Sequence, residues 1–294
     1  MTGATGFLGA HAARALLARG HRVIGTHIES PHRIERVETV TLDVSDPGPV
    51  RRLLRDLRPD AIVHTAAMTD VAACAREPEA ARRVNAEGTK HIVDAACEFV
   101  PSAPFLYTST DLVFDGAAAP YAEAAGTNPL TDYARQKLAG EAAALAHPTG
   151  TVLRVALLFG AGVFGRAGFL GWMRGTLARG ERLRLFRDEF RTPVAARDVA
   201  EALAALCESP LPGLFHAGGP ERLSRLEMGR LLCRAEGHRE ELLEPCALAE
   251  VPLPTPRPPD VSLESSKLVA AIGWHRTRFM DFLQEGRGRL PLPH

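Results

Sequence analysis

The chain is poor in cysteine, lysine and tyrosine, and it has no long hydrophobic run. Its five cysteines form no C-x-x-C pair, and neither they nor the histidines have zinc-ligand spacing, so we expect free thiols, a cytoplasmic location and no metal site. No apolar stretch approaches the ~18 residues of a membrane span, so we expect a soluble protein without a membrane partner. With three tyrosines and three lysines among 294 residues, the position of each becomes informative.

An excess of charge is also absent. The 35 basic and 35 acidic residues cancel, which leaves no overall field that would attract nucleic acid. The arginines near the C-terminus, in RTRFMDFLQEGRGRLP, are interrupted by acidic and apolar residues, which argues against a nucleic-acid surface there. An anionic ligand must therefore be held by a local arrangement of residues, and we expect a small-molecule partner.

The hydrophobic pattern alternates between strands and helices over the first 160 residues. Strands are expected at HRVIGTHI, VETVTLDV, DAIVHTAA, PFLYTST and GTVLRVALLFG, with helical stretches between them. This alternation predicts an α/β fold with a Rossmann-like, doubly wound parallel sheet. We therefore expect a dinucleotide-binding domain over residues 1–160, to which 191–217 return, and a smaller C-terminal substrate-binding cap over 161–294.

The sequence opens with the glycine-spaced stretch TGATGFLG, in which Gly3, Gly6 and Gly9 recur every third residue. Such spacing allows a tight turn from a strand into a helix, whose free N–H groups can then bind a phosphate. An ordinary glycine-rich turn is the alternative. Only Met1 stands where the preceding strand belongs. We expect this first strand, at the centre of the sheet, to be missing from the sequence, and the natural product to begin several residues earlier.

A tyrosine and a lysine lie four residues apart in YARQK, where Tyr133 and Lys137 share one face of an expected helix. A tyrosine hydroxyl is a weak acid, and a neighbouring ammonium lowers its pKa by stabilising the phenolate. This pair predicts a proton donor for a carbonyl oxygen, with a solvated helix face as the alternative. The stretch STDLVFDG adds hydroxyl groups at the end of a strand, where open α/β sheets bind ligands.

Taken together, these motifs resemble the extended short-chain dehydrogenase/reductase family, most closely its dTDP-4-dehydrorhamnose reductase-like branch. The resemblance is carried by TGATGFLG, by AAMTDVAACAREPEAARRVNAEGT, by STDLVFDG, by YARQKLAGE and by RPPDVSLESSKL. It implies that Tyr133 is the catalytic acid, that Lys137 lowers the pKa of Tyr133 and holds the cofactor, and that Thr110 hydrogen-bonds the reacting carbonyl. It further implies cofactor contacts that extend over the glycine turn and the ends of the next strands, at Gly3, Gly6, Phe7, Leu8, Asp43, Val44, Thr65, Ala66, Ala67, Tyr133 and Lys137.

The choice of cofactor depends on the residues that follow the strand HRVIGTHI. His27 and Arg33 stand near the position where an acidic residue would bind the ribose 2′-hydroxyl of NAD. Because both are basic residues, they favour the 2′-phosphate of NADP. Glu29 keeps NAD as the second choice. Asn85, in VNAEGT, is either structural or adjacent to the cofactor.

The resemblance implies an NAD(P)-dependent oxidoreductase that reduces a carbonyl, with a nucleotide-linked keto-sugar as the expected substrate. Thr110, Asp111 and Arg191 would contact this substrate, although Arg191 could equally be a structural salt-bridge partner. Leu157 replaces the tryptophan usual in this branch, which removes a surface for stacking on the sugar. A sugar-nucleotide epimerase with bound NAD and a catalytically silent NADP-binding regulatory subunit remain as alternatives. The resemblance also implies a homodimer that pairs through the helices at 79–98 and KLAGEAAALA.

Overall fold

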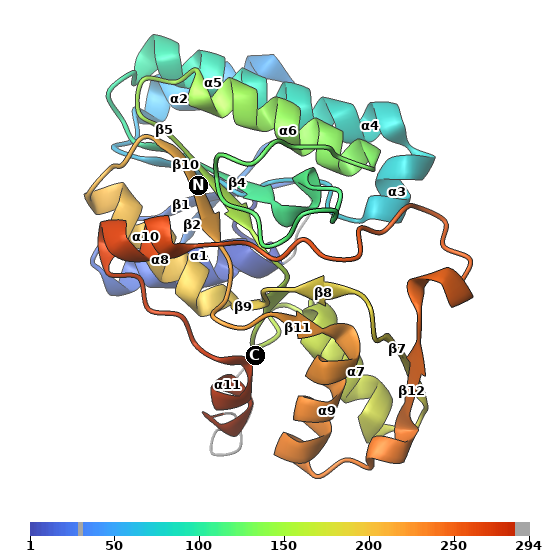
Figure 1. Cartoon of the computed structure of the whole chain (residues 1–294). Helices are drawn as coiled ribbons and strands as arrows, with labels where there is room; N and C mark the ends of the chain where they lie inside the picture. Colours follow the sequence, from blue (N-terminus) through green and yellow to red (C-terminus); the bar gives the residue numbers. More distant parts are fainter. Residues whose placement is uncertain (29–31, 286–294) are drawn as a thin grey trace.

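The computed structural model describes residues 1–28 and 32–285 (Figure 1). Eleven α-helices and twelve strands alternate along these residues, with short 3-10 and π-helical segments between them. The helices and strands are α1 (Phe7–Ala18), β1 (Ile24–His27), β2 (Glu38–Thr41), α2 (Pro47–Leu57), β3 (Ile62–His64), α3 (Val71–Arg76), α4 (Pro78–Arg82), α5 (Gly88–Phe99), β4 (Phe105–Thr110), α6 (Asp132–Leu145), β5 (Gly150–Val155), β6 (Leu158–Phe159), α7 (Gly168–Ala178), β7 (Leu183–Phe186), β8 (Phe190–Arg191), β9 (Val194–Ala195), α8 (Ala196–Glu208), β10 (Gly213–Ala217), β11 (Leu223–Ser224), α9 (Arg225–Glu236), β12 (Leu243–Cys246), α10 (Ser266–Ile272) and α11 (Phe279–Glu285).

The central sheet is parallel throughout. Four strands pair in the order β10-β5-β4-β3, and β1 and β2 form a second parallel pair. The segment 213–217 lies in this sheet as β10, beside β5. The predicted fold class, a Rossmann-like parallel sheet enclosed by helices, is therefore confirmed.

Helices cover both faces of the sheet. In Figure 1, α2, α5 and α6 lie above it, and α1 and α8 lie below. The strand residues alternate between the two layers, since Phe105 and Tyr107 belong to the apolar cluster with α2 and α5 whereas Leu106 belongs to the cluster with α1 and α8. The apolar strand run expected from the sequence is thus buried on both faces, as parallel sheets require.

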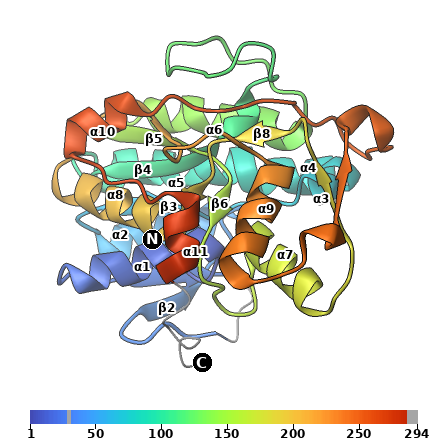
Figure 2. The same cartoon turned by 60° about the horizontal axis from the view of Figure 1, so that its bottom comes forward.

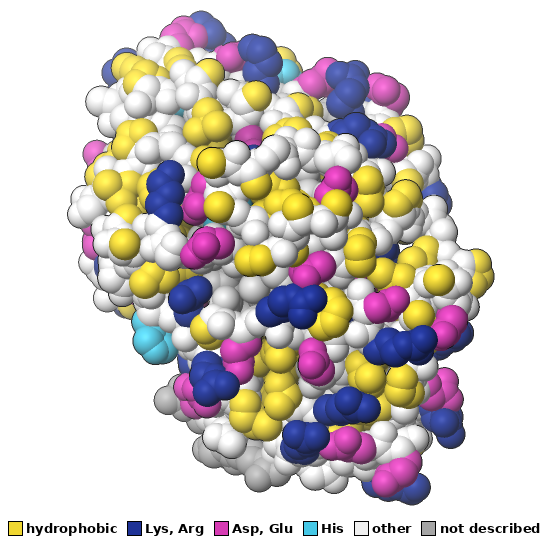
Figure 3. Space-filling view, viewed as in Figure 1, with side chains coloured by type: hydrophobic (Ala, Val, Ile, Leu, Met, Phe, Trp, Pro, Cys, Tyr) yellow, Lys and Arg dark blue, Asp and Glu magenta, His cyan; other side chains and the backbone are white. Residues whose placement is uncertain are grey.

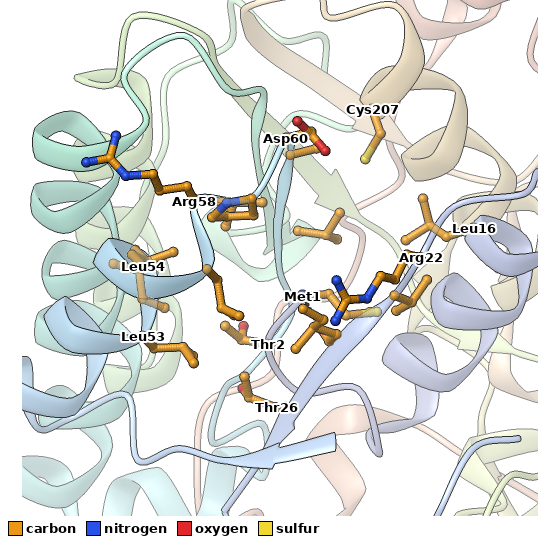
Figure 4. Close-up of a pocket in the computed structure, with 18 of the residues that line it drawn as sticks. Met1, Thr2, Leu16, Arg22, Thr26, Leu53, Leu54, Arg58, Asp60 and Cys207 are labelled. Carbon is orange, nitrogen blue, oxygen red and sulfur yellow. Dashed lines mark hydrogen bonds between the residues drawn. The ribbon is translucent and has the colours of Figure 1, made fainter. Parts of the chain in front are cut away.

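The centre of the sheet is incomplete at the N-terminus. The backbone of Met1 and Thr2 lies between β1 and β3: the Thr26 amide donates to Met1 O at 2.9 Å, and the Thr2 amide donates to Val63 O at 2.9 Å. Beyond Met1 the two strand edges are separated by a cavity of about 320 Å³, which we call the slot. Figure 4 shows Leu16 of α1 and Leu54 of α2 reaching it from opposite helical layers.

The C-terminal half builds a smaller layer beside the sheet. Helices α7, α9 and α11 lie together in Figure 2 and share an apolar cluster that includes Leu170, Met173, Leu232 and Phe279. Strand β7 pairs with β12, and β8 pairs with β11. This layer places the start of α9 and the strand β8 across from the carboxyl ends of the sheet strands.

The surface bears charges of both signs. Basic and acidic side chains are interspersed over the face seen in Figure 3, in keeping with the balanced composition. Among the described residues, no helix is long and apolar enough to cross a membrane. Within the same ranges, no group of three or more histidine, cysteine or acidic side chains is arranged to hold a metal ion. All five cysteines are free thiols.

Candidate active site

A cavity of about 700 Å³ opens at the carboxyl ends of the sheet strands, and we call it the main cavity. The N-terminus of α1, the ends of β3, β4 and β5, one face of α6 and the C-terminal layer all contribute to its wall. The residues predicted from the sequence that line it are Gly6, Phe7, Leu8, Thr65, Ala67, Thr110, Asp111, Tyr133, Lys137 and Arg191. The fold thus brings all three predicted catalytic residues and all three predicted substrate contacts to one place.

The glycine turn needs its glycines for steric reasons. Gly3 has φ +66°, and a Cβ on it would meet the backbone nitrogen of Ala66 at 2.7 Å. A Cβ on Gly9 would lie 2.0 Å from Gly3 O. The turn delivers α1 to the main cavity with Gly6 as its N-cap and without a capping side chain. Because the first N–H groups of a helix have no intrahelical partner, this end of α1 offers donors to an anionic group.

Tyr133 is buried in the first turn of α6, a helix that Thr131 caps through the Ala134 amide. Burial raises the pKa of its hydroxyl, and the nearby Asp111 carboxylate adds to the increase. The sequence-based expectation that Lys137 lowers this pKa is therefore wrong for the structure, because the loss of solvation outweighs any effect of the ammonium. Tyr133 accordingly holds its proton at neutral pH, as a proton donor must.

Lys137 is buried four residues further along the same face of α6. Its Nζ atom lies 4.1 Å from the centre of the Tyr107 ring. Burial lowers the pKa of this ammonium to about 7, against an opposing effect of Glu141. A lysine that titrates near neutrality is unusual and makes the site sensitive to pH.

Lys137 should make folding stability depend on pH. Its pKa is about 7 in the folded chain and near 10.5 in the unfolded chain, so the unfolded chain binds more protons between these values. The free energy of unfolding should therefore rise with pH from 7 to 9, by up to about 1.4 kcal/mol per unit from this group. Urea denaturation of wild type and Lys137→Met at several pH values measures the effect, and equal slopes in the two proteins would contradict it.

A buried ion pair holds α6 against the sheet. Arg154 of β5 donates to Glu141 of α6 from Nη2 at 2.8 Å and from Nε at 3.0 Å, and the Ser109 hydroxyl of β4 donates to the same carboxylate at 2.5 Å. The side chains of Arg154 and Glu141 are 5% and 3% exposed. This contact fixes the helix that carries Tyr133 and Lys137.

Removing the charge of Glu141 should be costly. In Glu141→Gln the Arg154 guanidinium stays buried without a counter-ion, so we expect a loss of about 3–5 kcal/mol in the free energy of unfolding. The double variant Glu141→Leu/Arg154→Met is the matched control, because replacing both charges with apolar groups should recover most of the loss. Chemical denaturation distinguishes the two, and a Glu141→Gln protein as stable as wild type would rule out the role given to this pair.

Several residues predicted to bind the cofactor lie outside the main cavity. Gly3 and Ala66 meet backbone to backbone beneath it. The Asp43 carboxylate is engaged by Ser45, through its amide and its hydroxyl. Val44 is buried against α5, His27 is the last residue of β1, and Arg33 lies in the segment between β1 and β2. Glu29 lies outside the described residues. The main cavity thus brings together predicted residues of the glycine turn and of α6. The predicted cofactor contacts Asp43, Val44, His27 and Arg33 are not among the residues that line it.

Asn85 has a structural position. It is buried in a π-helical segment (Arg83–Glu87), where its Oδ1 accepts from the Met68 amide at 2.8 Å and its Nδ2 donates to Met68 O at 3.0 Å. Nδ2 also donates to Gln136 of α6 at 3.1 Å. Asn85 therefore ties the loop after β3, whose residues line the main cavity, to α6, the helix that carries Tyr133 and Lys137.

The wall opposite Tyr133 carries charged residues that the sequence did not single out. Glu189 accepts hydrogen bonds from Arg191 at 2.9 Å, from Arg225 at 3.1 Å and from Arg257 at 3.3 Å. Arg191 also donates to the carbonyls of Phe190 and Pro258. Burial raises the pKa of Asp111 to about 6, although Arg191 and Arg225 oppose the increase. No local motif marks Glu189 or Arg225, since they meet because β11, which leads into α9, pairs with β8.

Comparison with known proteins agrees with this geometry. Residues 1–287 match the family described as RmlD substrate binding domain. A probable low-salt glycan biosynthesis reductase of Haloferax volcanii is 32% identical, over 96% of this chain and 95% of that protein. The dTDP-4-dehydrorhamnose reductase of Mycobacterium tuberculosis is 31% identical, over 92% of this chain and 86% of that protein.

Solved structures show the same architecture. A hypothetical dTDP-4-dehydrorhamnose reductase from Sulfolobus tokodaii superposes with a TM-score of 0.82 and 31% identity, over 95% of this chain and 96% of that one. A dTDP-4-dehydrorhamnose reductase from Bacillus anthracis, solved in complex with NADP, has the same fold at a TM-score of 0.81 and 21% identity, over 97% and 96%. The chain belongs to the RmlD substrate binding domain family, within the dTDP-4-dehydrorhamnose reductase-like branch of the extended short-chain dehydrogenases/reductases.

Proposed function

We propose that the protein is an NAD(P)-dependent reductase of a keto group on a sugar linked to a nucleoside diphosphate. The observation that carries the proposal is that Thr110, Tyr133 and Lys137 line one cavity with the uncapped N-terminus of α1. The three side chains and the free end of the helix thus line one volume, as a proton donor, a supporting lysine and a phosphate-binding turn would need to do. Relatives over almost the full length of the chain are named as reductases.

Tyr133 would donate the proton that the carbonyl oxygen needs as it becomes an alcohol. Its raised pKa keeps the hydroxyl protonated beforehand, and Thr110 at the end of β4 would hydrogen-bond the same oxygen and fix its position. Lys137, with its pKa near 7, would supply a buried positive charge once protonated, which favours the developing phenolate. The bound nicotinamide supplies the hydride that reaches the carbonyl carbon.

The residues of the glycine turn fit a dinucleotide. A side chain on Gly3 or Gly9 would collide with the backbone. The Gly6 amide donates to Gly3 O at 2.9 Å and closes the turn, which leaves the first N–H groups of α1 itself, at Phe7 and Leu8, directed to the main cavity. These groups would hold the pyrophosphate. NADP is the proposed cofactor, with His27 and Arg33 near its 2′-phosphate, in line with the NADP complex of the Bacillus anthracis reductase, which has the same fold.

The sugar end of the substrate would lie between Thr110 and the C-terminal layer. Leu157 lines the main cavity, so the contact at this position is aliphatic. An aliphatic wall gives contact area without the stacking that an aromatic ring offers. We therefore propose a keto-sugar nucleotide as the class, with a preference for sugars that present an apolar edge to Leu157.

We also propose that the protein acts in the cytoplasm as a homodimer. Free cysteines throughout the chain are in keeping with a reducing compartment. On the outer side of α6, Ala139, Ala142 and Leu145 are exposed at intervals of three residues and form an apolar stripe. The stripe would pack against the same helix of a second copy, and sedimentation equilibrium tests this directly.

The proposed reductase activity is tested by mixing the purified protein with NADPH and a panel of keto-sugar nucleotides while following the absorbance of the reduced nicotinamide. We expect oxidation of NADPH that depends on the keto-sugar. Tightly bound cofactor after purification, with interconversion of sugars and no net oxidation, would instead indicate an epimerase. No oxidation and no interconversion across the panel would favour a silent binding subunit.

A further inference from the structure

Two buried donor atoms at the wall of the main cavity have no hydrogen-bond partner among the described residues. They are Nε and Nη1 of Arg225, a residue only 8% exposed whose side chain lines the cavity. A buried guanidinium hydrogen left without an acceptor is costly, so native proteins rarely keep one unless water or a ligand satisfies it. Arg225 is therefore a candidate for direct contact with a ligand.

The neighbouring arginines are less available. Arg191 donates from Nη1 to two backbone carbonyls and from Nη2 to Glu189, so it acts as a brace between β8 and the segment at Pro258. Arg257 is 45% exposed and also bonds Glu189. Arg225 uses one nitrogen, Nη2, on Glu189. Among these three arginines, Arg225 is the one with fully buried nitrogen atoms that have no hydrogen-bond partner in the described part of the chain.

The charge of this wall is unbalanced. Three guanidinium groups share the carboxylate of Glu189. Asp111 is a second acid at this wall; its Oδ2 lies 3.9 Å from Arg191 Nε and has no hydrogen-bond partner in the described part of the chain. Three positive charges thus stand against the two carboxylates of Glu189 and Asp111. An anionic ligand would complete the balance.

The guanidinium is held ready for binding. Arg225 is the first residue of α9, after a capping box in which Ser224 and Glu227 bond each other's backbone amides. Its own amide donates to Glu189 O at 3.1 Å, and its guanidinium carbon lies 4.4 Å above the Phe169 ring. The backbone hydrogen bond, the ion pair with Glu189 and the contact with the Phe169 ring hold the Arg225 guanidinium in one orientation before a ligand binds. This lowers the entropic cost of binding.

We propose that Arg225 binds an oxyanion of the substrate. This inference rests on the proposed function, which makes a phosphate of the nucleoside diphosphate the ligand group in view. A carboxylate on the sugar would satisfy the same donors. The role is one of binding and of selecting substrates with a negative charge at this position, and no proton passes through Arg225.

The test is calorimetric titration, which needs no turnover. Thymidine 5′-diphosphate and thymidine are titrated into wild type, Arg225→Gln, Arg225→Lys and Arg222→Gln. Arg222 is the matched control, because it lies three residues earlier, is half-exposed and bonds Asp260 away from the main cavity. We expect Arg225→Gln to lose about 10- to 100-fold in affinity for the diphosphate and nothing for thymidine, with Arg225→Lys between and Arg222→Gln unchanged.

A second arm separates the two sources of the oxyanion. If Arg225 binds a carboxylate on the sugar, Arg225→Gln should leave the affinity for thymidine diphosphate unchanged. It should lower the affinity for UDP-glucuronate more than the affinity for UDP-glucose. Binding of NADP, and the thermal unfolding curve, show whether each variant is folded, and Arg225→Lys keeps the charge if the glutamine variant is not. Unchanged affinity for the diphosphate and an unchanged ratio for the two sugars would overturn the proposal. Binding that depends on Arg225 without any NADPH oxidation would contradict the reductase function alone.

Discussion

Tyr133→Phe should abolish most of the reductase activity while leaving the fold and cofactor binding intact. The ring remains to fill its buried place in α6, and only the hydroxyl that donates the proton is lost. Proton donation by a positioned side chain contributes about 10²- to 10⁴-fold, so we expect kcat to fall by that range. The affinity for NADPH, measured by fluorescence, should change by less than about twofold.

The small number of tyrosines makes the control simple. Tyr121→Phe removes a hydroxyl that bonds Asp115 and the Ala118 amide, in a ring stacked on Phe114 and away from the main cavity. This variant should keep its activity. If both variants retain wild-type rates, Tyr133 is not the proton donor. If both lose activity together with NADPH binding, the loss is structural and the assignment gains no support.

An apolar extension ahead of Met1 should stabilise the protein. Four β-branched residues fused there would continue the chain into the slot between β1 and β3 and pair with both strand edges. A cavity of this volume corresponds to about 8 kcal/mol at ~24 cal/mol per Å³, and ordering four residues costs about 6 kcal/mol. The new hydrogen bonds to the two neighbouring strands stabilise the folded chain further. We therefore expect the free energy of unfolding to rise by a few kcal/mol and Tm to rise by roughly 5–10 °C.

The extension would also remove a buried ionisable amine. The Met1 amino group donates to Ile24 O at 2.7 Å, and burial lowers its pKa to about 6 because the charged form loses solvation. A peptide bond at this position replaces the amine by an amide that does not ionise. A Gly-Ser-Gly-Asp extension of equal length is the control, since it also replaces the amine but fills no apolar volume. Equal Tm values for the two extended proteins would show that the slot does not accept a strand.

The sheet and the catalytic helix could be predicted because their signals are local. The apolar run at 105–107 and the pair Tyr133 and Lys137 need only strand and helix periodicity to be placed. The glycine turn could also be predicted from its local sequence. Gly3 approaches the backbone of Ala66 so closely that only a residue without a side chain fits there.

The rest depends on long-range packing. The pKa of Tyr133 could not be inferred from its spacing to Lys137, because burial dominates it, and that burial comes from packing against residues of α3 and α4 such as Cys74 and Ala81. Arg225 lies 36 residues from Glu189 in the sequence, and only the fold joins them. Arg191 was expected either to hold a diphosphate or to form a salt bridge, and its contacts with Glu189 and two carbonyls show it as a brace.

The path of the hydride tests the central claim most directly. The protein is incubated with NADPH deuterated at the transferring position and with a keto-sugar nucleotide, and the product is analysed by mass spectrometry. A reductase with Tyr133 as its acid should give a sugar one mass unit heavier at the reduced carbon, and in a fixed short time Tyr133→Phe should form about 10²- to 10⁴-fold less of it than wild type. Product that forms without deuterium, or equal amounts of labelled product from the two proteins, would contradict the account.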